Sequence, residues 1–198
     1  MHTESGKPVR FVPPGAKDAY YEVRVFESGE VETRPESLHD WFNALAWLSF
    51  PRTKARINAL HAVEIPREGG RRGRRRDMLT LFDEGGAIVQ CTDAQLVEMI
   101  SNFEWKHLFW TNRERVRSSM RILVLGHAVL EKALEPWGGL TCKVVFAHGD
   151  AEAADVLSRC ASPRELAPLP VFGYPGWLEQ DEAFYEDTRY FRERRSAR

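Results

Sequence analysis

The sequence predicts an α+β fold, in which an N-terminal helix hairpin packs on a small mixed sheet with βα units and an extended C-terminal strap crosses the domain. Three observations lead to this prediction. Apolar residues recur at helical spacing over residues 38–64. Strand-like and helix-like stretches alternate between residues 120 and 161. From Pro163 onward, prolines and aromatic residues replace both patterns.

Length and composition indicate one globular domain. The chain has 198 residues, of which 43% are hydrophobic and 29% charged. We expect a flexible lead-in over residues 1–19, a single domain over residues 20–191 and a charged tail over residues 192–198. The net charge of −1 argues against a domain that binds nucleic acid through its overall charge. Three widely spaced cysteines and the lack of a long apolar stretch predict a cytoplasmic protein without membrane contact.

The first elements are predicted to be a β-hairpin and a helix. Residues 20–34 alternate between apolar and polar side chains around a Ser-Gly pair, as hairpin strands do. Ser37 and Asp40 have the spacing of a capping box, which predicts a helix over residues 38–50. The side chains that this helix is expected to bury are Leu38, Trp41, Phe42, Leu45 and Leu48.

A second helix is expected to follow at once and to lie beside the first. Pro51 suits its first turn, and its apolar positions extend to about Glu64. After an arginine-rich segment, residues 77–91 contain two β-rich runs around Glu-Gly-Gly, which predicts a second hairpin. Thr92 and Gln95 form another capping-box pattern, so a third helix should begin there.

The remaining chain is predicted to add two βα units and the strap. Residues 120–126 and 140–147 have the pattern of buried strands, and a helix is expected after each, from His127 and over residues 150–161. The strap begins after Pro163, and its aromatic residues are expected to dock on the domain. Its predicted anchors are Trp177, Phe184 and Tyr185.

Two polar stripes on the N-terminal helices form the leading candidate site. Each stripe has helical spacing, so its members lie on one face. The first contains His39, Asn43 and Trp47, and the second contains Lys54, Asn58 and His61. If both stripes face inward, either His39 or His61 provides a general base, while Lys54 and the asparagines hold an anionic ligand, for example a phosphorylated one. The same stripes also fit a satisfied polar seam between packed helices, and the sequence leaves both interpretations open.

A second candidate is the pair His127 and Glu131, four residues apart at the start of a helix that follows a buried strand. Ligands gather at the carboxyl ends of strands in α/β sheets, so this pair is predicted to contribute to ligand binding. Metal coordination needs further donors, and Asp83 and Glu84 are the only remote options in the sequence. We therefore predict no metal site, and the sequence specifies no cofactor.

The arginine-rich segment suggests an alternative function. Six arginines fall within residues 67–76. Of these, Arg71, Arg72, Arg74, Arg75 and Arg76 could contact an RNA backbone. No aromatic residues are interleaved with them, so a mobile, solvated loop is favoured. The alternative is an interaction module for nucleic acid or protein, formed by this loop and the aromatic strap.

Several ordered motifs resemble one bacterial family. They are HDWFNALAWLSFPRTKARINALHAVE, DMLTLFDEGG, GHAVLEKAL, LPVFGYPGW and FYEDTRYF. Together they are similar to the domain of unknown function 3025 family from about Tyr20 to Phe191. The resemblance implies no activity, cofactor or catalytic residue, so the expected function comes from the site. We expect an uncharacterised protein that binds or acts on a small anionic ligand at the His/Asn/Lys pocket.

Overall fold

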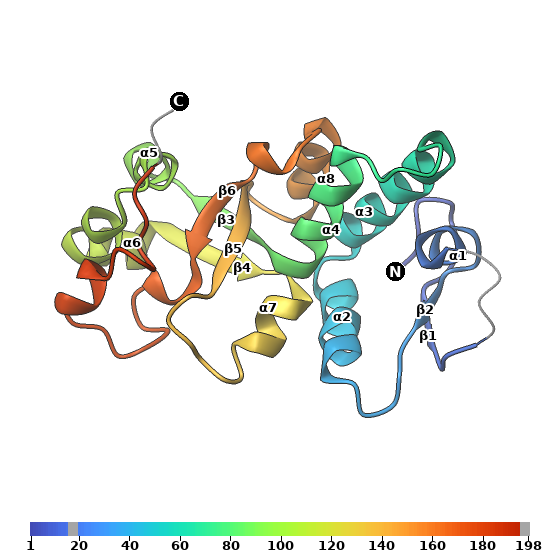
Figure 1. Ribbon diagram of the computed structural model, residues 1–198, viewed down its shortest axis with the longest axis horizontal. Coiled ribbons are helices and arrows are strands. Elements are labelled where there is room, and N and C mark those ends of the chain that lie inside the picture. The colour runs from blue at the N-terminus through green and yellow to red at the C-terminus, as the bar shows by residue number, and fades with distance from the viewer. Residues whose placement is uncertain (16–19, 195–198) are drawn as a thin grey trace.

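The α+β prediction is confirmed by the computed structural model, which describes residues 1–15 and 20–194 (Figure 1). Its central feature is a four-stranded mixed sheet with the order β4-β3-β5-β6. β3 pairs in parallel with β5 and antiparallel with β4, and β5 pairs antiparallel with β6. The strands are β3 (Gly86–Cys91), β4 (Met120–Val124), β5 (Thr141–Phe146) and β6 (Ala167–Pro170).

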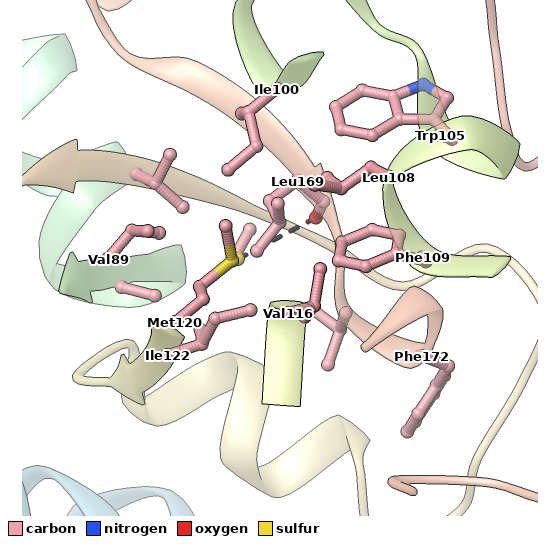
Figure 2. Close-up of a cluster of buried hydrophobic side chains, with 14 of the residues drawn as sticks. Val89, Ile100, Trp105, Leu108, Phe109, Val116, Met120, Ile122, Leu169 and Phe172 are labelled. Atoms are coloured by element: carbon pink, nitrogen blue, oxygen red, sulfur yellow. Dashed lines mark hydrogen bonds between the residues drawn. The ribbon is translucent and has the colours of Figure 1, made fainter. Parts of the chain in front are cut away.

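Both faces of this sheet are buried. Successive residues of a strand point to opposite faces, and in β3 the side chain of Val89 joins one apolar cluster while Ile88 joins another. The cluster around Val89 is drawn in Figure 2, where Ile100, Phe109 and Leu169 converge on it. The helices over the Ile88 face are α3 (Pro51–Glu64), α4 (Arg74–Gly85) and α8 (Asp150–Arg159).

The other elements lie around this central unit. In Figure 1, α5 (Ala94–Asn102) and α6 (Arg113–Ser119) lie at one end of the molecule, whereas α1 (Tyr21–Ser28), β1 (Arg10–Val12) and β2 (Glu30–Glu32) lie at the other. Helix α7 (His127–Lys132) contacts α4. A π-helical turn over His107–Thr111 precedes α6. No helix of residues 1–15 and 20–194 has both the length and the apolar character needed to cross a membrane.

The N-terminal region differs from its prediction. Residues 20–34 form α1 (Tyr21–Ser28) followed by β2 (Glu30–Glu32), and not a hairpin. The predicted lead-in contains β1 (Arg10–Val12), which pairs in parallel with β2, so its described part is docked on the domain. Gly29 has a φ of 76°, which ends α1 in the left-handed conformation that glycine adopts readily. The Ser-Gly pair is therefore a helix C-terminus, although its composition also suits a turn. Residues 16–19 lie outside the described residues.

The first predicted helix is confirmed as α2 (Leu38–Ser49), but its predicted buried face is wrong. The hydroxyl of Ser37 accepts a hydrogen bond from the backbone N–H of Asp40, as a capping residue does. The buried residues of α2 are Asp40, Ala44, Ala46 and Trp47. Leu38, Trp41 and Leu48 are exposed. Of the four buried residues, Trp47 belongs to the polar stripe, so the buried face of α2 includes part of that stripe.

The second predicted hairpin is also wrong, because residues 74–85 form α4 and only residues 86–91 form a strand. Met78, Leu79 and Phe82 are fully buried and have helical spacing, which the β-rich composition concealed. The Glu-Gly-Gly sequence is thus the junction between α4 and β3. The arginine-rich segment enters α4 and is not a wholly mobile loop.

The C-terminal strap is docked across the sheet edge, although one of its predicted anchors is not buried. Tyr185, Tyr190 and Phe191 are buried, Phe184 is partly buried and Trp177 is 36% exposed. The hydroxyl of Tyr190 donates to the carbonyl of Leu140 at 2.7 Å and accepts from the N–H of Phe172 at 2.9 Å. The bond to Leu140, the residue before β5, attaches the end of the strap to the sheet, and the bond to Phe172 joins two parts of the strap. Of the charged tail predicted over residues 192–198, residues 195–198 lie outside the described residues.

Candidate functional site

A polar pocket of about 390 Å³ lies where α1, β2, α2, the end of α4 and the start of α7 meet. Most of its lining residues are ionisable, which distinguishes it from the apolar interior on either face of the sheet. The lining residues are Tyr21, Glu22, Arg24, Glu32, Arg34, His39, Asp40, Asn43, Asp83, Glu84 and His127.

Helix α2 brings the first polar stripe to this pocket. His39 and Asn43 are one turn apart, and both line the pocket, while Trp47 lies one turn further on and is buried. The imidazole of His39 remains 32% exposed, so ligands can reach it from the pocket. Its Nδ1 atom lies 3.0 Å from Oε2 of Glu131 on α7.

A close backbone contact places α7 against the end of α4. A Cβ atom at Gly126 would lie 2.6 Å from Cα of Gly85 and 2.7 Å from the carbonyl oxygen of Glu84, so only glycine allows this approach. Glu84 is the residue before Gly85, and His127 follows Gly126. The contact therefore puts the side chains of Glu84 and His127 next to each other.

Two imidazoles share one carboxylate in the pocket. Nε2 of His127 lies 3.4 Å from Oε2 of Glu84, and Nε2 of His39 lies 3.8 Å from the same oxygen. The two rings have centroids 4.5 Å apart and an interplanar angle of 72°. His127 is buried, and a hydrogen bond from it lowers the pKa of Glu84. Its other nitrogen, Nδ1, is buried and has no hydrogen-bond partner among the described residues.

The second polar stripe lies behind the pocket wall. Lys54 is 3% exposed, and its ammonium lies 2.5 Å from Oδ1 of Asp83 and 2.8 Å from Oδ1 of Asn43. Burial raises the pKa of Asp83, but the neighbouring ammonium outweighs it, and the pKa is lower than usual. The charge of Lys54 is thus balanced by Asp83, whose side chain is 18% exposed, and the ammonium does not present a free charge to a ligand.

Asn58 positions the carboxyl group of Glu22, which lies on α1. Its amide nitrogen donates at 2.8 Å both to Oε2 and to the backbone carbonyl of Glu22. Burial and the nearby Asp83 carboxylate raise the pKa of Glu22 to about 7. Glu22 can therefore carry a proton or release it near neutral pH, which is the property that a general acid or base requires.

His61 does not reach the pocket. It is 2% exposed, and its Nδ1 accepts a hydrogen bond from Nε of Arg76 at 3.3 Å. Burial lowers its pKa to about 4, and the Arg76 guanidinium acts in the same direction. A neutral, buried imidazole in this position belongs to the polar seam between α3 and α4, which was the alternative interpretation of this stripe.

Two arginines at the pocket are held by carboxylates. Arg24 pairs with Glu32 at 2.5 Å, and Nε and Nη2 of Arg34 contact the two oxygens of Asp40 at 2.8 and 2.9 Å. These bonds from Arg34 lower the pKa of Asp40 to about 2. The side chain of Arg34 is 60% exposed, so one edge of its guanidinium is open to ligands in solution.

The structure thus separates the predicted site residues. His39, Asn43 and His127 line one pocket, and Glu131 supports His39. Lys54 and Asn58 lie behind its wall, and His61 lies between α3 and α4.

The sequence prediction missed the contribution of α1, including Glu22, because the alternating pattern of that segment predicts a hairpin. It considered Glu84 only as a remote donor, and the Gly-Gly sequence after it was the one signal for a close backbone approach.

Three of the arginines expected in a solvated loop are engaged with acids. Arg72 pairs with Asp77, Arg75 with Glu64 and Arg76 with Glu68. Arg71 and Arg74 are exposed. An interaction module for nucleic acid or protein would therefore have fewer free arginines than the sequence suggested. It would also have fewer free aromatic rings, because the strap is docked on the domain.

Comparison with known proteins identifies one family. A family model described as "Protein of unknown function (DUF3025)" matches residues 9–195, which is nearly the whole chain. The match confirms the resemblance seen in the sequence motifs. No curated protein and no solved structure matches the chain significantly.

Proposed function

The chain belongs to the DUF3025 family, and we propose that it binds a small ligand bearing an anionic group and acts on it by proton transfer in the α1–α2–α4–α7 pocket. The observation that carries this proposal is the convergence of proton-carrying groups and an open guanidinium on one cavity. His39 and Glu22 line its walls, and Arg34 lies at the same pocket with most of its side chain exposed. Three free, separated cysteines support a reducing, cytoplasmic setting for this activity.

The proposed anion-binding group is Arg34, in place of Lys54. The ammonium of Lys54 is enclosed by Asp83 and Asn43, whereas the guanidinium of Arg34 has donors beyond the two that bind Asp40. A planar guanidinium binds phosphate or carboxylate oxygens in pairs, which favours an anionic ligand of that shape.

The proposed proton carriers are His39 and Glu22. The imidazole of His39 is reachable from the pocket and is held in orientation by Glu131. The carboxyl group of Glu22 has a pKa of about 7, close to the value at which a group transfers protons most effectively at neutral pH. Two carriers on different walls of one cavity fit a reaction in which one group accepts a proton and another donates it.

Phosphate binding tests this proposal. Inorganic phosphate serves as the probe, and its affinity is measured by calorimetry with a chelator present. Arg34→Gln should weaken binding at least about tenfold, because a charge-assisted contact contributes about 1.5–3 kcal/mol. Arg115→Gln is the matched control, since Arg115 also clamps an aspartate at a helix N-terminus, Asp93, but lies outside the pocket. Equal losses in both variants, or no binding by the wild-type chain, would contradict the proposal.

A further inference from the structure

We propose that His39, His127 and Glu84 bind a divalent transition-metal ion of the zinc class, an inference that rests on the proposed function because the metal occupies the same pocket. Each of the three residues offers one donor atom, and all three atoms lie within 4.8 Å of one another. The donors come from three separate elements, α2, α4 and α7, so the tertiary fold assembles the site.

The spacing of the donors fits a tetrahedral ion. A metal about 2.1 Å from each ligand separates neighbouring ligands by about 3.4 Å. Nε2 of His127 and Nε2 of His39 lie 3.4 and 3.8 Å from Oε2 of Glu84. The donor atoms of His39 and His127 lie within 4.8 Å of each other, and movement of the partly exposed His39 side chain toward the other two donors would complete the geometry.

Glu131 supplies the supporting contact that metal-bound histidines usually have. Its Oε2 lies 3.0 Å from Nδ1 of His39. With Nδ1–H donating to this carboxylate, Nε2 carries a lone pair and points toward Glu84. Lone pairs of a nitrogen and a carboxylate oxygen repel one another at this distance unless a proton or a cation lies between them. A metal ion removes this repulsion.

The charges of the pocket also favour the binding of a cation. Glu32, Asp40 and Asp83 are each paired with a permanently charged side chain. In residues 1–15 and 20–194, the ion pairs of Glu84 are with His39 and His127 alone. A divalent ion would balance Glu84 and the nearby Glu131 together.

The donor set selects the class of metal. Two imidazoles and one carboxylate suit Zn²⁺, Co²⁺, Mn²⁺ or Fe²⁺, whereas Mg²⁺ and Ca²⁺ prefer oxygen ligands alone. Three protein ligands leave at least one coordination position open, as in catalytic sites. That position faces a pocket of about 390 Å³, where a water molecule or the anionic group of the ligand can bind. The metal would lower the pKa of such a water and so supply a nucleophile near neutral pH. With Nε2 of His39 bound to the ion, this water would take the place of His39 as the proton carrier that acts with Glu22.

Metal titration tests the proposal directly. The full chain is stripped with a chelator, and binding of Zn²⁺ is measured by calorimetry and binding of Co²⁺ by its visible absorption. We expect one ion per chain and the spectrum of a four- or five-coordinate site. His39→Gln, His127→Gln and Glu84→Gln should each abolish stoichiometric binding. His107→Gln, which changes an exposed histidine outside the pocket, should bind as the wild-type chain does.

Glu131→Gln tests the positioning role separately. Loss of the carboxylate behind His39 should weaken Zn²⁺ binding about 10–100-fold while leaving the stoichiometry at one. Melting temperatures of all variants, measured in chelator, show whether each variant is folded. Should a donor variant be unfolded, Co²⁺ protection of the wild-type imidazoles from diethyl pyrocarbonate provides a second measurement. Bound Co²⁺ should protect His39 from the reagent and leave His107 reactive.

Three results would overturn the metal site. They are absence of stoichiometric binding, binding that is unchanged in all three donor variants, and loss of binding in His107→Gln alone. The proposed function has its own outcome, because phosphate binding is measured in chelator. Phosphate binding that depends on Arg34 without any metal binding would refute only the metal site. Metal binding without phosphate binding would refute only the anion-binding function.

Discussion

The ammonium of Lys54 lies 2.5 Å from the Oδ1 atom of Asp83, and Lys54 is 3% exposed. Asn43 accepts a second hydrogen bond from the same ammonium. Helix α3 is thereby joined both to α4 and to α2 behind the pocket. This buried pair fixes the wall from which Asn43, Asp83 and the adjacent Glu84 face the cavity, so the second polar stripe supports the site without entering it.

Removing this ammonium should destabilise the fold strongly. Lys54→Met leaves the carboxylate of Asp83, whose side chain is only 18% exposed, charged and without its cation, which we expect to lower the free energy of unfolding by about 3–5 kcal/mol. Urea denaturation measures the loss. The double variant Lys54→Met/Asp83→Leu should lose less than the single one, because neither buried charge remains. A single variant within about 1 kcal/mol of the wild-type chain would show that the pair is not buried as described.

His61 should make the protein sensitive to acid. Its pKa is about 4 in the folded chain, against 6.5 for the free side chain. The unfolded state therefore binds more protons between these values, and stability is full above pH 6.5 and declines as pH falls through 4. The contribution is on the order of 3 kcal/mol. His61→Gln, which can still accept from Arg76, should flatten this part of the stability profile. An unchanged slope would argue against a neutral, buried His61.

Glu22 should make the protein less stable as the pH rises, which is the opposite of the effect of His61. Its pKa is about 7 in the folded chain, against 4.5 for the free side chain. The folded state therefore binds more protons in this interval, so the stabilisation is complete below pH 4.5 and is lost as pH rises through 7. Glu22→Gln, which stays neutral, should remove the decline. Denaturation midpoints at pH 5 and pH 8 measure it, and a wild-type profile that is flat across this interval would contradict the raised pKa.

Docking of the C-terminal strap should depend on the hydroxyl group of Tyr190. Tyr190 is buried and bonds Leu140 and Phe172. In Tyr190→Phe the N–H of Phe172 loses its partner, whereas the carbonyl of Leu140 keeps its hydrogen bond from the N–H of Val171. An orphaned buried N–H costs about 1–3 kcal/mol, and we expect a loss within that range. Tyr20→Phe is the matched control, because Tyr20 is 68% exposed. Equal melting temperatures in the two variants would mean that the strap does not dock through Tyr190.

The sequence was sufficient to predict the α+β class, α2 with its Ser37 cap, and the alternating elements from residue 120 onward. Those features depend on local periodicity and capping. It misread α1 and α4 because both contain β-branched or aromatic residues whose burial depends on distant partners. Met78 and Phe82, for example, face a sheet that forms only in the folded chain. Tertiary packing thus overrides local propensity in these two helices.

The candidate site was predictable only in part. Spacing within one helix brought His39 and Asn43 together, and an i,i+4 interval identified His127 with Glu131. Spacing could not bring Glu84 to the imidazoles, because that meeting depends on the backbone contact between Gly85 and Gly126, which are far apart in the sequence. Nor could spacing show that the stripe with Lys54 faces an acid on α4 and not the cavity.

The backbone contact that assembles the site should be intolerant of a single methyl group. In Gly126→Ala the new Cβ would lie 2.6 Å from Cα of Gly85 and from N of Gly86, both backbone atoms that cannot turn away. We expect α7 to move, the free energy of unfolding to fall by about 1–3 kcal/mol and the affinity for Zn²⁺ to fall as well.

Gly85→Ala is the control, because its Cβ would meet only Val129, at an ordinary 3.7 Å. It should keep the stability or raise it by up to about 1 kcal/mol, since alanine is the better helix former. Calorimetric Zn²⁺ titration and urea denaturation of both variants make the comparison. A Gly126→Ala chain that matches Gly85→Ala in both measurements would show that the approach of α7 to α4 is looser than the contact implies, and that Glu84 and His127 are brought together by other means.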